Sequence, residues 1–212
     1  MISKYRIKAP GGETKILLHA CCAPCSSAIV EYLLANDVRP TLFYFNPNIY
    51  PHEEYEKRKA ECIRHAQLLG LQFIDAENNS LSTELKSLTG FLNAQCSTLN
   101  SGHAAWLEAV RGLEGEPERG ARCLQCFRLR LTATASFAAE NGFKVFATTL
   151  ASSRWKDLNQ IQEAGEAAAA SFPNLIFWAQ NWRKGGLSER RNELIRTYGF
   201  YNQSYCGCEF SI

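Results

Sequence analysis

Seven of the nine cysteines in this chain of 212 residues lie in three short clusters. The clusters run over Cys21–Cys25, Cys123–Cys126 and Cys206–Cys208. Thiols grouped in this way at separated points of a chain are typical of sites that bind metal or carry out redox chemistry. Cys62 and Cys96 stand alone, and we expect the first to be a small buried hydrophobe on a helix and the second a free thiol in a loop.

The sequence favours reduced thiols over a disulfide framework. Residues 1–14 include basic residues but no apolar run after them, so they do not resemble a secretory signal. No stretch approaches the ~18 consecutive apolar residues of a membrane span. An odd number of cysteines also argues against a structural disulfide set. We therefore expect a cytoplasmic protein with no membrane partner, whose thiols act as ligands or catalysts.

Composition leaves the partner open. The hydrophobic content of 46% is ordinary for a globular protein, and 212 residues can bury a core without metal staples. The formal charge of +2 is only mildly basic, so it neither requires nor excludes a nucleic-acid partner. Any basic surface must therefore be local.

Short apolar runs alternate with segments of helical pattern. The runs predict strands at 15–19, 41–45, 72–74, 145–149 and 175–178. Helices are predicted over about 25–35, 52–69, 123–141, 156–171 and 188–198. This order predicts an α/β fold, with a Rossmann-like (HUP- or PP-loop-like), mostly parallel sheet flanked by helices. We expect an N-terminal extension over 1–14, a single α/β domain over 15–212, and an insertion or lid over about 77–102.

The cysteines lie where such folds bind ligands. Cys21 and Cys22 directly follow the first predicted strand, and Cys25 lies in the first turn of the next helix, where the helix dipole stabilises a thiolate. Cys123 and Cys126 open another helix three residues apart, so their sulfurs can point the same way. The sequence thus predicts a cysteine-rich metal site at the carboxyl ends of the strands. The C-terminal cysteines must fold back to join it.

Four kinds of site are compatible with these clusters. A thioredoxin-like motif would use Cys22–Cys25 at a helix start but leaves the other clusters unexplained. A structural zinc site would use the two CxxC pairs and leave the C-terminal cysteines idle. A PP-loop ATP-pyrophosphatase needs a Gly/Ser-rich phosphate loop after the first strand, where this chain has His-Ala-Cys-Cys. The fourth is an iron–sulfur enzyme, which spacing alone places level with zinc.

Five segments of the chain resemble the QueH family, the cobalamin-independent epoxyqueuosine reductases. In chain order they are LLHACCAPCSS, FYFNPNIYPHEEYEKRK, GLEGEPERGARCLQCFRLRL, FATTLASSRWKDLNQI and NWRKGGLSERRNELIRTYGFYNQSYCGCEFS. The resemblance runs from about Lys15 to the C-terminus. It implies an iron–sulfur oxidoreductase of queuosine biosynthesis, which removes the epoxide oxygen from the modified base at the tRNA wobble position.

The resemblance also implies roles for the cysteines. Cys21, Cys22, Cys123 and Cys126 correspond to the ligands of a 4Fe–4S cluster. Cys206 and Cys208 correspond to a catalytic pair cycling between dithiol and disulfide, recharged by an external electron donor. Cys25 falls on the remaining family cysteine, which could act in catalysis or ligate a second, mononuclear iron. Asp75 is the candidate carboxylate ligand of that iron, although the family's Asp-Tyr-Asp is replaced here by a segment containing Glu77-Asn78-Asn79.

Basic and aromatic residues point to a tRNA partner. The candidate contacts to substrate or tRNA are Arg154, Trp155, Lys156, Arg183, Lys184, Arg190 and Arg191, together with His19 beside the first cysteines. Cations with stacking aromatic rings suit an anticodon loop with a splayed base. For any single arginine a solvated helix face is the favoured explanation, and a structural hydrogen bond explains His19 as well as a role at the site does. The rival function is a zinc-stabilised RNA-binding module without turnover.

Overall fold

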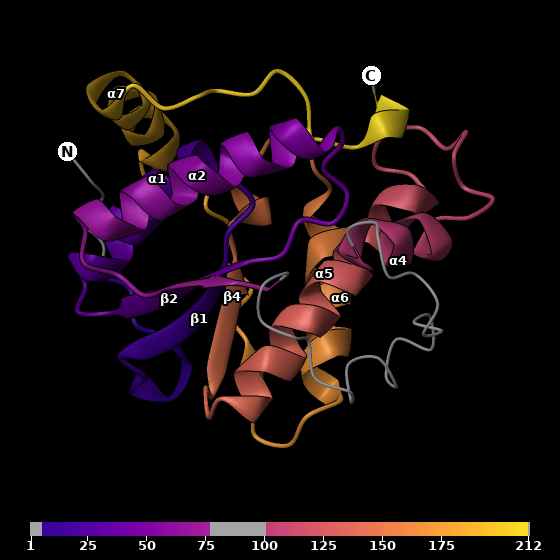
Figure 1. Ribbon diagram of the computed structural model, residues 1–212. Coiled ribbons are helices and arrows are strands. Elements are labelled where there is room, and N and C mark those ends of the chain that lie inside the picture. The colour runs from indigo at the N-terminus through magenta and orange to yellow at the C-terminus, as the bar shows by residue number, and fades with distance from the viewer. Residues whose placement is uncertain (1–5, 77–100, 212) are drawn as a thin grey trace.

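A five-stranded parallel sheet forms the centre of the computed structural model, which describes residues 6–76 and 101–211 (Figure 1). The strand order is β3-β2-β1-β4-β5, and every neighbouring pair is parallel. The strands are β1 (Lys15–His19), β2 (Arg39–Tyr44), β3 (Phe73–Asp75), β4 (Val145–Thr148) and β5 (Ile176–Phe177). The expectation of an α/β fold with a parallel sheet is confirmed.

Helices cover both faces of this sheet (Figure 1). One face carries α1 (Ala23–Leu34), α2 (His52–Leu68) and α7 (Leu187–Tyr198). The other carries α5 (Ala121–Glu140) and α6 (Leu158–Ala170), with α4 (Ser101–Ala109) packed beside α5. Three short 3₁₀ helices complete the described elements: η1 (Pro10–Gly12), η2 (Thr149–Ser152) and η3 (Glu209–Ser211).

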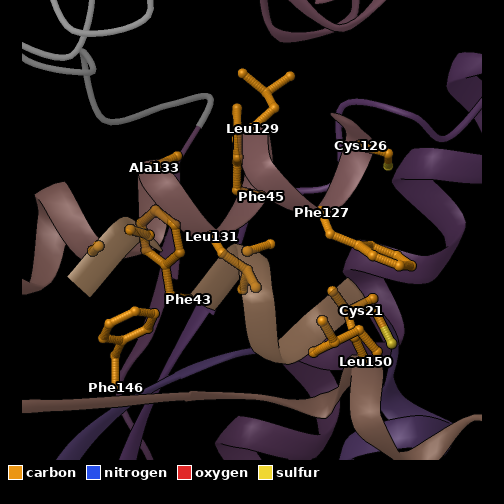
Figure 2. Close-up of a cluster of buried hydrophobic side chains, with 14 of the residues drawn as sticks. Cys21, Phe43, Phe45, Cys126, Phe127, Leu129, Leu131, Ala133, Phe146 and Leu150 are labelled. Atoms are coloured by element: carbon orange, nitrogen blue, oxygen red, sulfur yellow. The ribbon is translucent and has the colours of Figure 1, made fainter. Parts of the chain in front are cut away.

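Alternation along the central strands explains this layering. Leu17 and Phe146 are register partners on β1 and β4, and both belong to the core cluster beneath α5 and α6. Figure 2 shows Phe146 within this cluster. On β1, the two residues that flank Leu17, Ile16 and Leu18, belong to the cluster on the opposite face, which packs on α1 and α7. Successive side chains of a strand point to opposite faces, so an uninterrupted apolar run fills both cores.

The strand order places a topological switch point between β1 and β4. From β1 the chain moves outward through β2 to β3, then crosses back to β4 and continues to β5. The loops that follow β1 and β4 therefore lead to helices on opposite faces of the sheet. A crevice opens where such loops diverge, and ligands bind there in open α/β sheets.

The structure adds one helix that the sequence pattern does not predict. The predicted insertion ends at about 102, yet α4 begins at Ser101. Most of that insertion and Cys96 lie outside the described residues. At the other end, Ala9 is buried and Ile7 donates its backbone N–H to Asn36 Oδ1, so the described part of the N-terminal extension packs on the core. Within the described ranges, no helix is both long and apolar enough to span a membrane.

Candidate metal and redox site

A cavity of about 810 Å³ lies at the carboxyl ends of β1 and β4. Six of the seven clustered cysteines line it: Cys21, Cys25, Cys123, Cys126, Cys206 and Cys208. The seventh, Cys22, lies behind this wall, with its Sγ 3.9 Å from Sγ of Cys21. The fold thus brings three clusters from distant parts of the chain to one cavity.

The first cluster is held by the junction of β1 and α1. Cys22 precedes the first turn of α1 with extended backbone, and Pro24 occupies that turn, where its fixed φ suits a helix start. Cys25 follows in the same turn. The sulfurs of Cys21, Cys22 and Cys25 all lie within 4.8 Å of one another and are buried. This is a ligand spacing that a single metal ion or a cluster can occupy.

Both adjacent cysteines of this cluster receive hydrogen bonds from other elements. The Thr149 hydroxyl, just after β4, donates to Cys21 Sγ over 3.3 Å. The Gln203 amide in the C-terminal segment donates to Cys22 Sγ over 2.9 Å. Donors aimed at sulfur stabilise the thiolate and tune a metal bound to it.

The second cluster is positioned by the start of α5. Cys123 and Cys126 lie one turn apart, so both face the cavity (Figure 2 shows Cys126 at the same edge of the core as Cys21). The backbone N–H of Arg119 donates to Cys123 Sγ over 3.3 Å. The Arg130 guanidinium lies 3.9 Å from Cys126 Sγ and is held there by Asn46. A hydrogen-bond donor therefore lies beside the sulfur of each of four cysteines: Cys21, Cys22, Cys123 and Cys126.

Burial and crowding prevent the first three thiols from ionising together. Hydrogen bonds from Cys22 and Cys25 lower the pKa of Cys21, against the effect of burial. Burial raises the pKa of Cys22, and the interaction with Cys21 raises that of Cys25 to about 11. These shifts favour ionisation of Cys21 over that of its two neighbours. A metal cation would remove this limit, because it stabilises every thiolate that it binds.

In the C-terminal pair, ionisation of Cys206 is favoured over ionisation of Cys208. The hydrogen bond from the Cys208 thiol lowers the pKa of Cys206 to about 5, against burial, and the Cys208 backbone N–H 3.4 Å from Cys206 Sγ adds to this effect. The same contact and burial raise the pKa of Cys208. A thiolate is the nucleophilic form of cysteine, and a neighbouring thiol can resolve what it forms.

Comparison with known proteins identifies the family of this chain. The family model described as epoxyqueuosine reductase QueH matches residues 16–88 and 77–212. The epoxyqueuosine reductase QueH of Histophilus somni is 41% identical over 98% of this chain and 76% of its own length. The protein of that name from Haemophilus influenzae is 40% identical over 99% of this chain and 76% of its own length. The one from Acinetobacter baylyi is 39% identical over 99% and 85%. The chain belongs to the QueH family.

The cysteines of this QueH chain fit a sulfur-ligated metal centre. The buried Cys21, Cys22 and Cys25 supply three soft ligands at one point, and the Cys123 and Cys126 pair faces the same cavity. Thiolate ligands select zinc, copper(I) or iron–sulfur clusters over hard cations. The hydrogen-bond donors beside the sulfurs supply the surroundings that such ligands need.

Five of the predicted substrate residues line the rim of this QueH cavity: Arg154, Trp155, Lys156, Arg183 and Arg191. Trp155 is 65% exposed, and the Arg154 guanidinium lies 4.7 Å from the centre of its ring. The loop that carries both is held by the turn before α5, because Arg119 donates to their backbone carbonyls. A large aromatic surface is thereby held in solvent at the mouth of the cavity.

Two other predicted cations lie elsewhere. Arg190 forms an ion pair of 2.7 Å with Glu31 of α1 and another with Glu193, so it fastens α7 to α1. Lys184 is exposed and is not among the residues that line the cavity. The sequence places both beside the other basic residues, but the direction of each side chain depends on how α7 packs.

His19 and Asp75 are not among the residues that line the cavity. His19 is fully buried beneath the site and contacts the Thr148 hydroxyl at 2.8 Å and the Phe45 carbonyl at 3.1 Å; burial lowers its pKa to about 3. Asp75 ends the edge strand β3 and forms an ion pair of 3.1 Å with Lys59. Its strand is separated from β1 by β2, which explains why the carboxylate does not join the cysteines.

The structure adds polar residues that the sequence did not single out. Asn48 is 2% exposed and lines the cavity, with an Oδ1 that has no hydrogen-bond partner among the described residues. The Gln203 amide nitrogen donates to Cys22 Sγ, and its buried Oε1 likewise has no hydrogen-bond partner among the described residues. Trp106 of α4 lines the same cavity. The position of Asn48, three residues after the second predicted strand, is the one local signal that could have drawn attention to it.

Gly207 is expected to tolerate no side chain. Its φ of +106° is unfavourable for other residues, and an added Cβ would lie 2.8 Å from Ile49 Cγ1 and 3.3 Å from Ile49 Cα. The Gly207→Ala variant should therefore lose about 1–3 kcal/mol of unfolding free energy. Denaturant unfolding measures this loss. Gly112→Ala is the matched control, because Gly112 also has positive φ but nothing within 4 Å of the added atom. Equal losses in the two variants would contradict a steric role for the Gly207 contact.

Proposed function

We propose that this chain reduces epoxyqueuosine at the wobble position of tRNA to queuosine. Membership of the QueH family supports the reaction. The observation that carries the proposal is that three cysteine clusters meet in one cavity, whose mouth is basic and bears an exposed tryptophan. Metal ligands, a redox pair and a nucleic-acid contact surface are then combined at one site.

The cofactor in this proposal is a 4Fe–4S cluster held by Cys21, Cys22, Cys123 and Cys126, and no cobalamin is required. Each of the four sulfurs has a hydrogen-bond donor outside its own cysteine cluster, which supports this choice of ligands. In the described part of the chain, Cys25 has no such donor from outside its own cluster, so it suits a separate role as ligand of a second iron. When bound, these centres supply single electrons and a Lewis acid.

The Cys206 and Cys208 dithiol balances the reaction. Opening the epoxide to an alkene breaks two C–O bonds and requires two electrons and two protons. The pair provides both electrons as its S–S bond forms, one proton comes from the Cys208 thiol and the other from solvent, and the oxygen leaves as water. An external electron donor must then reduce the disulfide. The low pKa of Cys206 supports its role as the reacting thiolate, with Cys208 as the resolving thiol and proton source.

The basic rim would receive the anticodon loop. Arg154, Lys156, Arg183 and Arg191 surround the mouth of the cavity, where they can neutralise phosphates. The Trp155 ring offers a stacking surface for a base next to the modified one. A substrate base that leaves the stack could then enter the cavity and meet the cysteines.

Removal of the Trp155 ring should weaken tRNA binding. Stacking on an aromatic side chain contributes about 1–3 kcal/mol per base, so Trp155→Ala should raise the Kd for an anticodon stem-loop about tenfold to a hundredfold. Trp155→Phe should restore most of the affinity. Fluorescence anisotropy with a labelled stem-loop measures the three constants. Lys144→Ala is the control, since Lys144 precedes β4 at the opposite end of the strand. Unchanged affinity in Trp155→Ala would exclude the ring as a binding surface.

The function itself is tested with protein purified without oxygen. Iron, sulfide and zinc are measured first, followed by conversion of epoxyqueuosine-containing tRNA in the presence of dithionite. About four or five irons, matching sulfide and formation of queuosine would support the proposal. Stoichiometric zinc without sulfide, and no product, would instead indicate the RNA-binding module.

A further inference from the structure

Arg58 joins α2 to the backbone of the C-terminal cysteines. The residue is 3% exposed, and its guanidinium donates to the carbonyl of Cys206 over 3.1 Å and to that of Tyr205 over 3.3 Å. The third donor, Nε, binds Glu54 at 2.7 Å. A planar guanidinium can make these contacts simultaneously, whereas a lysine ammonium cannot reproduce the geometry.

Glu54 fixes the direction of Arg58. Its carboxylate accepts hydrogen bonds from the Tyr201 hydroxyl at 2.9 and 3.2 Å in addition to the ion pair. The two residues are four positions apart on α2, where side chains lie on the same face. The guanidinium is thus aimed by a carboxylate that is itself held by the C-terminal segment.

The next peptide is held from a second direction. The backbone N–H of Tyr50 donates to the Gly207 carbonyl over 2.9 Å, and the Tyr205 hydroxyl donates to the carbonyl of Tyr50. The carbonyls of three successive residues, 205 to 207, therefore all accept hydrogen bonds from outside their own turn. Cys206 and Cys208 are both free thiols in this arrangement.

We propose that Arg58 is a positioning residue that holds the Cys206-Gly207-Cys208 turn in its dithiol conformation and thereby sets the balance between dithiol and disulfide. The proposal rests on the proposed function, in which this pair is redox-active. A disulfide across one residue needs its own S–S torsion and Cβ separation, so the peptides between the two cysteines must rotate to close it. Those peptides carry the Cys206 carbonyl, which accepts from Arg58, and the Gly207 carbonyl, which accepts from the Tyr50 backbone N–H. Loss of the Arg58 contacts should therefore favour the disulfide.

The equilibrium of this pair can be read separately from the other cysteines. Trypsin cleaves after Arg196 and releases residues 197–212, which contain Cys206 and Cys208 and no other cysteine. The full-length protein is equilibrated without oxygen in reduced and oxidised glutathione, which accepts the two electrons and protons of the dithiol. It is then alkylated and digested. The mass of the peptide shows two added groups for the dithiol and none for the disulfide.

Arg58→Lys should shift the ratio of disulfide to dithiol about tenfold toward disulfide, because the hydrogen bond to the Cys206 carbonyl, in a peptide between the two cysteines, is lost together with the one to the preceding Tyr205 carbonyl. Glu54→Gln should shift it less, in the same direction, and carries the test if Arg58→Lys fails to fold. Arg64→Lys is the matched control: Arg64 lies on the same helix and donates to the carbonyl of Tyr198, outside the turn. A ratio within twofold of the unsubstituted protein in the test variant, or an equal shift in Arg64→Lys, overturns the proposal.

This measurement requires no tRNA. A shifted ratio in Arg58→Lys supports the positioning role even if the unsubstituted protein forms no queuosine, which would refute the proposed function alone. Conversely, an unshifted ratio in a protein that does form queuosine overturns the role of Arg58 and leaves the proposed function intact.

Discussion

Replacing either Cys206 or Cys208 by serine is expected to lower the formation of queuosine at least about a thousandfold, because a two-electron pair cannot work with one sulfur. Serine keeps the size and hydrogen bonding of the thiol but cannot form a disulfide. Neither residue belongs to the proposed cluster ligands, so iron and sulfide should remain unchanged. Single-turnover conversion of epoxyqueuosine-containing tRNA, with iron analysis of the same sample, measures both quantities.

Cys62→Ala provides the comparison for these serine variants. Cys62 is a buried thiol on α2 that does not line the cavity, so its removal should leave turnover and iron content close to those of the unsubstituted protein. Full activity in Cys206→Ser or Cys208→Ser would refute the dithiol. Loss of iron along with activity would place these cysteines among the ligands instead. The pair would then hold the metal rather than carry its own electrons.

The sequence predicts the core of the fold because the central strands depend on local pattern. The apolar run of β1 is buried on both faces, which only a central parallel strand permits. By contrast, α4 has no acidic residue in its first turn and begins Ser-Gly, so its local pattern is weak. Its position depends on Trp106, which stacks on Phe210 at 5.7 Å, a contact with the far end of the chain. A contact between residues so far apart along the chain cannot be predicted from the local sequence pattern.

The site is predictable to the same extent. Convergence of the cysteines follows from motifs at strand ends and helix starts, since parallel strands all end at one edge. Asp75 also lies at the carboxyl end of a strand, but the order of strands in space puts that strand at the edge of the sheet. Arg190 shows the same limit, because its partner Glu31 lies 159 positions away on a different helix. Residue type and spacing identify candidates, whereas strand order and helix packing decide which of them meet.

The donors to sulfur illustrate what only the fold supplies. Thr149 reaches Cys21 because β4 lies next to β1, although the two residues are 128 positions apart. Gln203 reaches Cys22 because the C-terminal segment folds back over α2. The hydrogen bond from Gln203 connects the proposed cluster ligands to the segment that carries the redox pair. The reducing end and the metal end of the site are thus linked through one side chain.

Cys123→Ser is expected to remove the cluster. Losing even an outer partner of a ligand lowers metal affinity about tenfold to a hundredfold, so the loss of a ligand itself should cost at least about a hundredfold. The serine hydroxyl is a harder, less acidic ligand than thiolate and cannot replace it for iron–sulfur chemistry. Iron and sulfide should both fall far below those of the unsubstituted protein, and the visible absorption of the cluster should disappear with them. Elemental analysis of protein purified without oxygen measures this outcome.

Cys62→Ala again serves as control for Cys123→Ser, because it removes a thiol of the same fold that lies outside the cavity. A drop in iron confined to Cys123→Ser would support a ligand at the start of α5, while normal iron and sulfide would remove Cys123 from the ligand set. The sulfide content distinguishes an iron–sulfur cluster from a zinc ion, the two kinds of metal centre that two CxxC pairs can bind. A zinc site would also lose its metal when Cys123 is replaced, but it contains no sulfide to lose. Loss of iron and sulfide together is therefore the result that only a cluster bound through α5 explains.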